Sequence, residues 1–385
     1  MDSDNMYSSD PDGDPTAQAE REQLMKAMIS KARKGRGAGD NPPNRFESTR
    51  VEKDPDHFIY DMPELLEARP VSTEFFPDQS QSILSKNDSP DVPFRFSINP
   101  YRGCEHGCAY CYARPGHEYL GLGAGIDFET KIQVKFDAPR ILREALADPK
   151  WKPDLVAISG VTDCYQPAER KLRLTRGLLE VLLEARQPCG IVTKNALCLR
   201  DLDLIKEMAS RNLIHMNISL TTLDTELARG MEPRTSSPDA RLRAIRVLAE
   251  NGVPVRVIVA PVIPGLTDHW IPHVLEAAAA VGANAASYVL LRLPLSVEPV
   301  FLAWLEQHHP QAKDRVIKLI RECRGGEMSD STFGSRMSGT GPYATGIRTT
   351  FDVFSRKFGL NQSLPPLDFS QFTPPDCGER QLRLF

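Results

Sequence analysis

The chain contains no run of eighteen apolar residues, so it lacks the length of apolar sequence that a membrane-spanning helix needs. It also lacks an excess of basic side chains, because 47 lysines and arginines against 51 aspartates and glutamates leave a net charge of −4. That balance argues against binding nucleic acid through bulk charge. The first residues are acidic and lack the apolar stretch of a secretory signal. We therefore predict a cytoplasmic protein, whose eight cysteines are thiols or metal ligands rather than disulfides.

The two ends of the chain differ in composition from its middle. Residues 1–45 contain few apolar side chains and are predicted to form a disordered tail. A basic, glycine-rich cluster at residues 31–36 is either a solvated part of this tail or a flexible arm that contacts phosphates. Residues 46–93 carry many helix breakers, which indicates an extended segment wrapped over the core. Residues 296–360 are typical of a helical and irregular extension, and residues 361–385 of a proline-rich tail.

Between these ends, short apolar strands alternate with helical patterns. The expected strands cover residues 94–99, 155–159, 190–193, 215–220, 255–260 and 285–291. The expected helices cover residues 170–185, 201–211, 239–251 and 269–281. Asp201 is the expected N-cap of the second helix, and Gly252 the residue that ends the third. This alternation predicts parallel βα units that close into a full or partial barrel over residues 94–295, with functional residues at the carboxyl ends of the strands.

Three cysteines share one loop just after the first expected strand. Cys104, Cys108 and Cys111 form C-x3-C-x2-C within YRGCEHGCAYCYARPG. Thiolates suit zinc or an iron–sulfur cluster, but a structural zinc site usually has four ligands, and no fourth lies at a fitting spacing. Three cysteines suit a 4Fe–4S cluster with one iron left open for chemistry. The alternative is a set of structural cysteines or a zinc knuckle.

The cysteine spacing, with the aromatic Tyr110 just before the last cysteine, resembles the signature of radical S-adenosylmethionine (radical SAM) enzymes. The resemblance implies an α/β fold, a partial (βα)6 TIM-like barrel of the radical SAM type. It also implies two cofactors, a 4Fe–4S cluster and S-adenosylmethionine. An electron from a donor such as flavodoxin or ferredoxin cleaves S-adenosylmethionine to methionine and a 5′-deoxyadenosyl radical, which abstracts hydrogen from a substrate.

Residues 94–295 resemble one branch of this superfamily, that of spore photoproduct lyase and related DNA repair proteins. The resemblance rests on the sequences Cys108–Tyr112, Ser159–Asp163, Thr193–Asn195 and Ile218–Leu220, and on the segment Gly230–Leu242 followed by APVIPGLTD. It implies that S-adenosylmethionine is faced by three side chains and that a tyrosine lies over its adenine through backbone contacts. The three side chains are those of Thr162, Lys194 and Ser219, and the tyrosine is Tyr110.

One position departs from this branch. Spore photoproduct lyase returns hydrogen to its substrate from a cysteine on the loop after the second strand, and that position is Gly160 here. Cys164, four residues later, is either an alternative hydrogen donor or a buried neutral thiol. Tyr112 is a candidate radical relay. Thymine-dimer splitting therefore does not follow from the sequence.

The chain ends in a short sequence that resembles the peptide by which bacterial DNA repair and replication proteins bind the sliding clamp. In this reading Leu384 and Phe385 fill a pocket, Leu382 precedes them, and Gln381 forms a hydrogen bond at its edge. The alternative is an apolar pair packed on the barrel. Arg321, Arg324 and Arg336, near a glycine-rich stretch, are candidate phosphate ligands.

These observations predict a radical SAM enzyme, similar to a lyase, that acts on nucleic acid in DNA repair. Modification of RNA is an alternative within the same class. A non-catalytic iron–sulfur protein, either a redox sensor or a clamp-associated DNA-binding module, is the alternative of another class.

Overall fold

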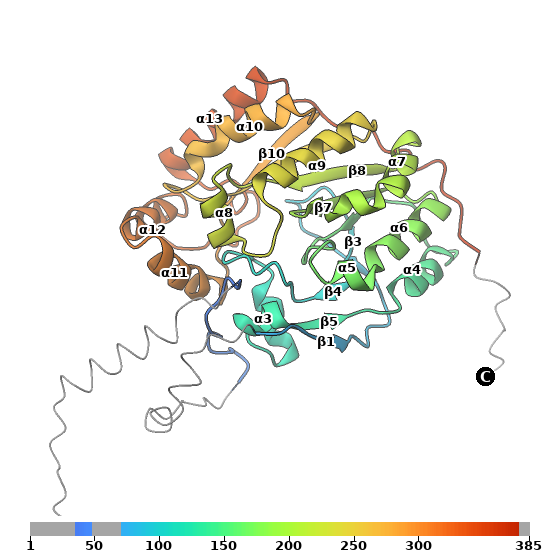
Figure 1. The fold of residues 1–385 in the computed structure, drawn as a ribbon, viewed down its shortest axis with the longest axis horizontal. Helices are drawn as coiled ribbons and strands as arrows, with labels where there is room; N and C mark the ends of the chain where they lie inside the picture. The colour runs from blue at the N-terminus through green and yellow to red at the C-terminus, as the bar shows by residue number, and fades with distance from the viewer. Residues whose placement is uncertain (1–34, 48–70, 377–385) are drawn as a thin grey trace, which may run out of the picture.

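The computed structural model describes residues 35–47 and 71–376, and its centre is a curved seven-stranded sheet (Figure 1). The strand order is β10-β9-β8-β7-β6-β3-β2. The strands are β2 (Leu84–Lys86), β3 (Phe96–Ile98), β6 (Val156–Ile158), β7 (Cys189–Thr193), β8 (Ile214–Ser219), β9 (Val255–Val262) and β10 (Ala285–Leu290). From β3 to β10 the neighbours are parallel and follow chain order, as successive right-handed βα units require. The predicted partial barrel is thus confirmed, and β2 adds an antiparallel edge strand.

Helices cover the outer face of the sheet between successive strands (Figure 1). They are α4 (Ala138–Leu146), α6 (Leu174–Glu184), α7 (Leu202–Ser210), α9 (Pro238–Glu250) and α10 (Ile271–Ala280). Two short helices, α5 (Glu169–Leu172) and α8 (Thr225–Met231), follow β6 and β8, and α8 packs against the cysteine loop. Short 3-10 helices lie at Arg114–Gly116, Glu118–Leu120, Ala196–Asp201 and Asp268–Trp270. Helix α9 begins where Ser237 Oγ accepts the Ala240 N–H, and it ends before Gly252 at φ 74°. The predicted role of Gly252 is therefore confirmed.

Two local predictions about helices are wrong. The helix expected over residues 170–185 is broken at Arg173, which adopts φ 53°. The break lets the buried Glu169 carboxylate accept both the Thr175 N–H and the Tyr101 hydroxyl. Asp201 precedes α7 without capping it, because its carboxylate is taken by Arg200 and by the Tyr165 hydroxyl. A polar side chain at the start of a helix caps the helix only when no other group competes with the backbone N–H groups for it.

A second, three-stranded sheet lies below the barrel in Figure 1 and supports the cysteine loop. Its order is β1 (Glu74–Pro77), β5 (Lys131–Val134) and β4 (Tyr101–Arg102), with α3 (Ile126–Thr130) running directly into β5. Strand β1 comes from the segment that the sequence predicts to be an extended wrap, of which residues 48–70 lie outside the described part.

The carboxyl-terminal region adds three helices and a packed strand-like segment. The helices are α11 (Val297–His308), α12 (Lys313–Glu322) and α13 (Gly341–Lys357). Residues 361–376 do not form a free tail, since they run along the barrel and bond to it through Asp368 N–H to Asn212 O and Thr373 N–H to Ala185 O, both at 2.9 Å. The clamp-like sequence at residues 381–385 lies outside the described residues. No helix of the described part is long and apolar enough to cross a membrane.

Candidate active site

The three cysteines lie on a largely buried loop whose backbone is held from several sides. Cys104 N–H donates to Phe128 O of α3 at 2.8 Å, and Ala109 N–H donates to Met231 O of α8 at 3.0 Å. The side chains of Cys104 and Cys108 are buried and that of Cys111 is half-buried. The loop is therefore a preformed element, fixed between the second sheet and the helix after β8.

The cysteine set fits a cluster better than a single ion. Within residues 35–47 and 71–376, no three metal-ligating side chains converge on one point as a mononuclear site requires. The cysteines of a cubane cluster do not need to converge on one point, because each cysteine binds a different iron. Burial raises the pKa of the Cys108 thiol, so the pocket by itself disfavours a thiolate. A cationic metal centre supplies the missing stabilisation, and the three residues fit a 4Fe–4S cluster.

A buried ion pair between Arg114 and Glu129 supports this loop. Arg114, fully buried, donates to Cys108 O at 2.9 Å and to Glu129 Oε1 at 2.6 Å. Glu129 lies near the carboxyl end of α3 and is also fully buried. Because Arg114 binds both the loop carbonyl and the carboxylate, the position of Cys108 depends on Glu129.

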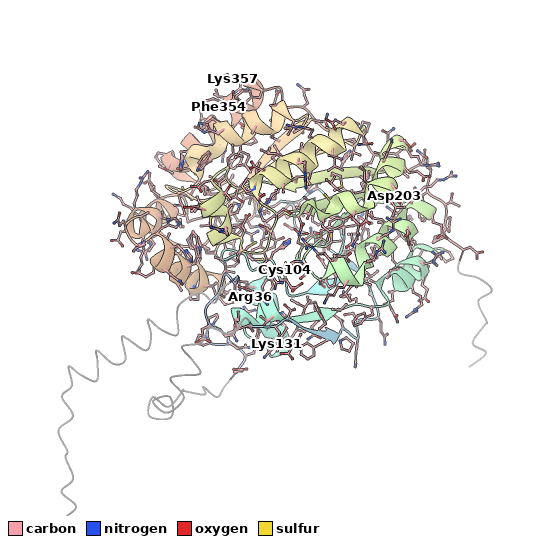
Figure 2. The ribbon with its side chains drawn as sticks, viewed as in Figure 1. Arg36, Cys104, Lys131, Asp203, Phe354 and Lys357 are labelled. Atoms are coloured by element: carbon pink, nitrogen blue, oxygen red, sulfur yellow. The ribbon has the colours of Figure 1, made fainter. Side chains whose placement is uncertain are left out.

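Residues 35–38, which we call the strap, dock onto the same carboxylate. The N–H groups of Gly37 and Ala38 donate to the two oxygens of Glu129 at 3.0 and 2.9 Å, and Arg36 donates to its backbone carbonyl at 2.7 Å. Arg36 and Cys104, both labelled in Figure 2, lie on the same side of the molecule, next to α3. The prediction of a disordered tail is therefore wrong for residues 35–45, and the rest of that tail lies outside the described residues. Backbone amides and the Arg36 guanidinium fix the strap through hydrogen bonds.

We expect Gly37→Ala to loosen the hold on the cluster. A Cβ at position 37 would stand 1.7 Å from the Gly107 carbonyl oxygen, in the middle of the cysteine loop, so the strap or the loop must move. Such over-packing costs about 1–3 kcal/mol, which corresponds to a loss of about five- to 150-fold in cluster retention. The measurement is the rate of iron release to a chelator. Gly116→Ala is the matched control, since a Cβ there meets nothing within 4 Å, and equal rates for the two variants would contradict the prediction.

Lys194 and Ser219, predicted to face S-adenosylmethionine, do lie together at the carboxyl ends of β7 and β8. Lys194 Nζ donates to Ser219 Oγ at 2.7 Å and to Ala260 O at 2.9 Å. The ammonium also lies 5.6 Å from the centre of the Tyr110 ring. Three of the four predicted cofactor residues thus share one cluster of side chains.

A buried carboxylate that the sequence analysis missed joins these residues. Glu232 accepts hydrogen bonds from the hydroxyls of Tyr110 and Thr221 and from Arg241, and it lies 3.3 Å from Lys194 Nζ. Burial alone raises the pKa of Glu232, but Arg241 and then Lys194 outweigh it and hold that pKa well below its usual range. Glu232 follows the unpredicted helix α8 within GMEPRT, in the segment Gly230–Leu242 that resembles the spore photoproduct lyase branch, but the resemblance assigned no role to this glutamate.

The fourth predicted residue, Thr162, is placed differently. Its hydroxyl donates to Tyr101 O at 2.8 Å, and its side chain is buried. The neighbouring Asp163 makes the functional link instead, because it accepts from the Thr193 hydroxyl and the Lys194 N–H at 2.8 and 2.7 Å. Asp163 Oδ2 also lies 3.4 Å from His106 Nδ1 on the cysteine loop. Asp163 therefore ties the loop after β6 to both the cysteine loop and the end of β7.

The two candidate radical residues have different environments. Cys164 is fully buried in the main apolar core, and burial raises its pKa well above the usual value. This placement favours the alternative of a buried neutral thiol over a hydrogen donor. Tyr112 is 48% exposed as a residue, and its hydroxyl donates to Gly160 O at 2.6 Å. Gly160 has little room for a cysteine, since an added Cβ would meet Ser97 Cβ at 3.0 Å.

Comparisons with known proteins agree with this geometry. The fold and the cysteine loop define an iron–sulfur barrel protein, and the family model described as the radical SAM superfamily matches residues 98–278. Uncharacterised proteins of Mycobacterium tuberculosis and Mycobacterium bovis are 40% identical over 232 residues, which are 60% of this chain and 68% of theirs. The chain belongs to the radical SAM superfamily. It is accordingly an enzyme, whose cofactors are a 4Fe–4S cluster and S-adenosylmethionine.

Two further proteins are similar at lower identity. A protein named radical SAM Nalpha-GlyT isomerase, from Pseudomonas phage M6, is 26% identical over 232 residues, which are 59% of this chain and 46% of that protein. The structure of spore photoproduct lyase complexed with dinucleoside spore photoproduct has a TM-score of 0.53 and 16% identity, and it covers 79% of this chain and 92% of that one. At that identity, the second likeness shows the fold alone.

Proposed function

We propose that this radical SAM enzyme abstracts hydrogen from a nucleotide of damaged DNA. In this proposal Cys104, Cys108 and Cys111 hold the cluster, which supplies the electron that cleaves S-adenosylmethionine. Lys194 and Ser219 give the carboxylate or ribose of S-adenosylmethionine a cation and a hydroxyl at the strand ends. Tyr110 adjoins the adenine through its backbone, because its hydroxyl is already bound to Glu232.

The observation that carries the nucleic-acid substrate is the surface around Tyr112. Tyr112 directly follows the cluster residue Cys111 and is 48% exposed as a residue, and the guanidinium of Arg292 lies 5.8 Å from the centre of its ring. Val161, on the loop bonded to Tyr112, is 47% exposed. An accessible aromatic face with a cation beside it is what proteins use to stack an unpaired base and hold its backbone.

Two other features support the same substrate class. The barrel shares its fold with a lyase whose structure was determined with a dinucleoside, a fragment of nucleic acid. The sequence Gln381–Phe385, outside the described residues, resembles a peptide that docks on the bacterial sliding clamp and would bring the enzyme to DNA. Hydrogen return through Cys164 is not part of the proposal, because that thiol lies in the core.

The test is anaerobic and measures one product. The cluster-loaded protein receives S-adenosylmethionine and dithionite, and 5′-deoxyadenosine is quantified with no nucleic acid, with undamaged DNA, with ultraviolet-irradiated DNA and with RNA. We expect slow formation of 5′-deoxyadenosine alone and a clear acceleration by irradiated DNA. Acceleration by RNA instead would favour RNA modification, and no effect of any polymer would remove the nucleic-acid substrate. No product from a fully loaded, reduced cluster would point to a sensor or binding module.

A further inference from the structure

Arg292 is a half-buried cation at the mouth of the barrel. The N–H groups of its guanidinium have no strong acceptor among the described residues. Arg292 follows the last strand, β10, and its guanidinium lies beside the Tyr112 ring. Its one hydrogen bond to a described residue goes to the thioether sulfur of Met337 at 3.7 Å, and thioethers are weak acceptors. Among residues 35–47 and 71–376, no carboxylate lies within ion-pair distance of this guanidinium.

The neighbouring Arg324 and Arg336, in contrast, bind other parts of the described chain through their guanidinium groups, although Arg324 Nε has no partner there. Arg324 donates to the backbone carbonyls of Leu291 and Arg336 at 2.6 and 2.9 Å, so it holds the glycine-rich segment against β10. Arg336 pairs with Asp91 and lies over the Phe333 ring. These contacts are structural, and the sequence-based prediction that Arg324 and Arg336 bind phosphates is not supported. Arg292, which no sequence motif marks, keeps guanidinium donors that have no strong acceptor among residues 35–47 and 71–376.

The acids nearest to Arg292 already have partners of their own. Asp91 accepts the Gly334 N–H at 2.7 Å besides its pairing with Arg336. Asp330 accepts the Thr332 N–H and the Ser335 hydroxyl, at 2.8 and 2.5 Å. Burial, and then the charge of Arg336, lower the pKa of Arg292, and the opposing effects of Asp91 and Asp330 are smaller. On the same strand-end segment, the buried Ser296 hydroxyl also lacks a hydrogen-bond partner in the described part of the chain.

We propose that Arg292 binds a phosphate diester of the nucleic-acid substrate, next to the nucleotide that stacks on Tyr112. This inference rests on the proposed function. A guanidinium offers two parallel N–H donors that match two phosphate oxygens, which the thioether contact does not satisfy. The exposed side chain of Tyr112 then provides apolar surface for the base beside that phosphate. Arg292 holds the phosphate backbone of the nucleic-acid strand, and the Tyr112 ring, next to the cluster, holds the stacked nucleotide.

The test compares binding of a fluorescent, thymine-rich single strand, irradiated with ultraviolet light, to cluster-loaded protein at several salt concentrations. We expect Arg292→Gln to bind about tenfold more weakly, as the loss of one charge-assisted contact predicts. The slope of log K against log salt should fall in magnitude by about 0.7, the value for one phosphate of a single strand. Arg292→Lys should retain the slope and part of the affinity. Arg211→Gln, at the end of α7 and paired with Glu207, is the matched control and should change neither.

A second series identifies the contacted group. Single methylphosphonate linkages, which remove one phosphate charge, are placed along the strand. At one linkage, we expect the methylphosphonate to weaken binding of the strand by the wild-type protein and to leave binding by Arg292→Gln unchanged. Additive losses at every linkage would overturn the proposal, and so would a loss of S-adenosylmethionine affinity in Arg292→Gln without any oligonucleotide. If the wild-type protein binds no strand at all, the proposed function itself fails. If it binds but Arg292→Gln behaves like the wild type, only the phosphate site fails.

Discussion

Replacing Cys108 by alanine is expected to remove the cluster and all cleavage of S-adenosylmethionine. Cys108 is buried, its carbonyl is fixed by Arg114, and a 4Fe–4S cluster held by three cysteines has no spare ligand among them. With two thiolates left, reconstituted protein should bind far less iron and should lack the brown colour. Iron and sulfide per chain, the visible spectrum and 5′-deoxyadenosine formation measure this.

The matched control is Cys189→Ala. Cys189 is also a fully buried cysteine, but it lies on β7 within the core, so the same substitution should leave iron content and product formation unchanged. If Cys108→Ala keeps a full complement of iron and sulfide, the assignment of the cluster loop is wrong. If both variants lose iron, the losses reflect folding rather than ligation.

The parts of the site that the sequence predicted are those whose signals are local. The cysteine loop has its ligands within eight positions. Lys194 and Ser219 were implied by the resemblance of the short sequences around them to the spore photoproduct lyase branch, and they lie at the ends of β7 and β8. Parallel strands bring their carboxyl ends to one edge, so residues far apart in the chain meet there without any further information.

The parts that the sequence did not predict depend on contacts between distant segments. The strap was expected to be disordered because it is polar, yet its backbone amides bind Glu129, about ninety residues away. Thr162 follows a strand as expected, but its hydroxyl turns to the carbonyl of Tyr101. Glu232 follows a short helix that has no strong periodic pattern. In each case a buried polar group forms a hydrogen bond with a group that lies near it only in the folded chain.

Replacing Glu232 by glutamine is expected to destabilise the apo chain and to disorder the S-adenosylmethionine pocket. The substitution keeps the volume of the side chain but leaves Arg241, which is 1% exposed, and Lys194 without their shared counter-charge. Breaking a buried ion pair in this way typically costs about 3–5 kcal/mol. Urea unfolding of the cluster-free protein measures the loss. The control, Glu180→Gln, removes an exposed partner of Arg176 and should cost less than about 1 kcal/mol.

Lys194→Ala separates the two roles of this network. It removes one of the two cations but leaves Arg241 paired with Glu232, so the free energy of unfolding should fall less than in Glu232→Gln. The cluster and its colour should remain, because Lys194 contacts the cysteine loop through the Tyr110 ring, at 5.6 Å, and not through a cysteine. The affinity for S-adenosylmethionine should drop. Unchanged affinity in Lys194→Ala would show that the pocket assignment is wrong. If Glu232→Gln unfolds no more easily than Glu180→Gln, the carboxylate is not the centre of the network. The two variants together therefore test separately whether Glu232 supports the fold and whether Lys194 binds the cofactor.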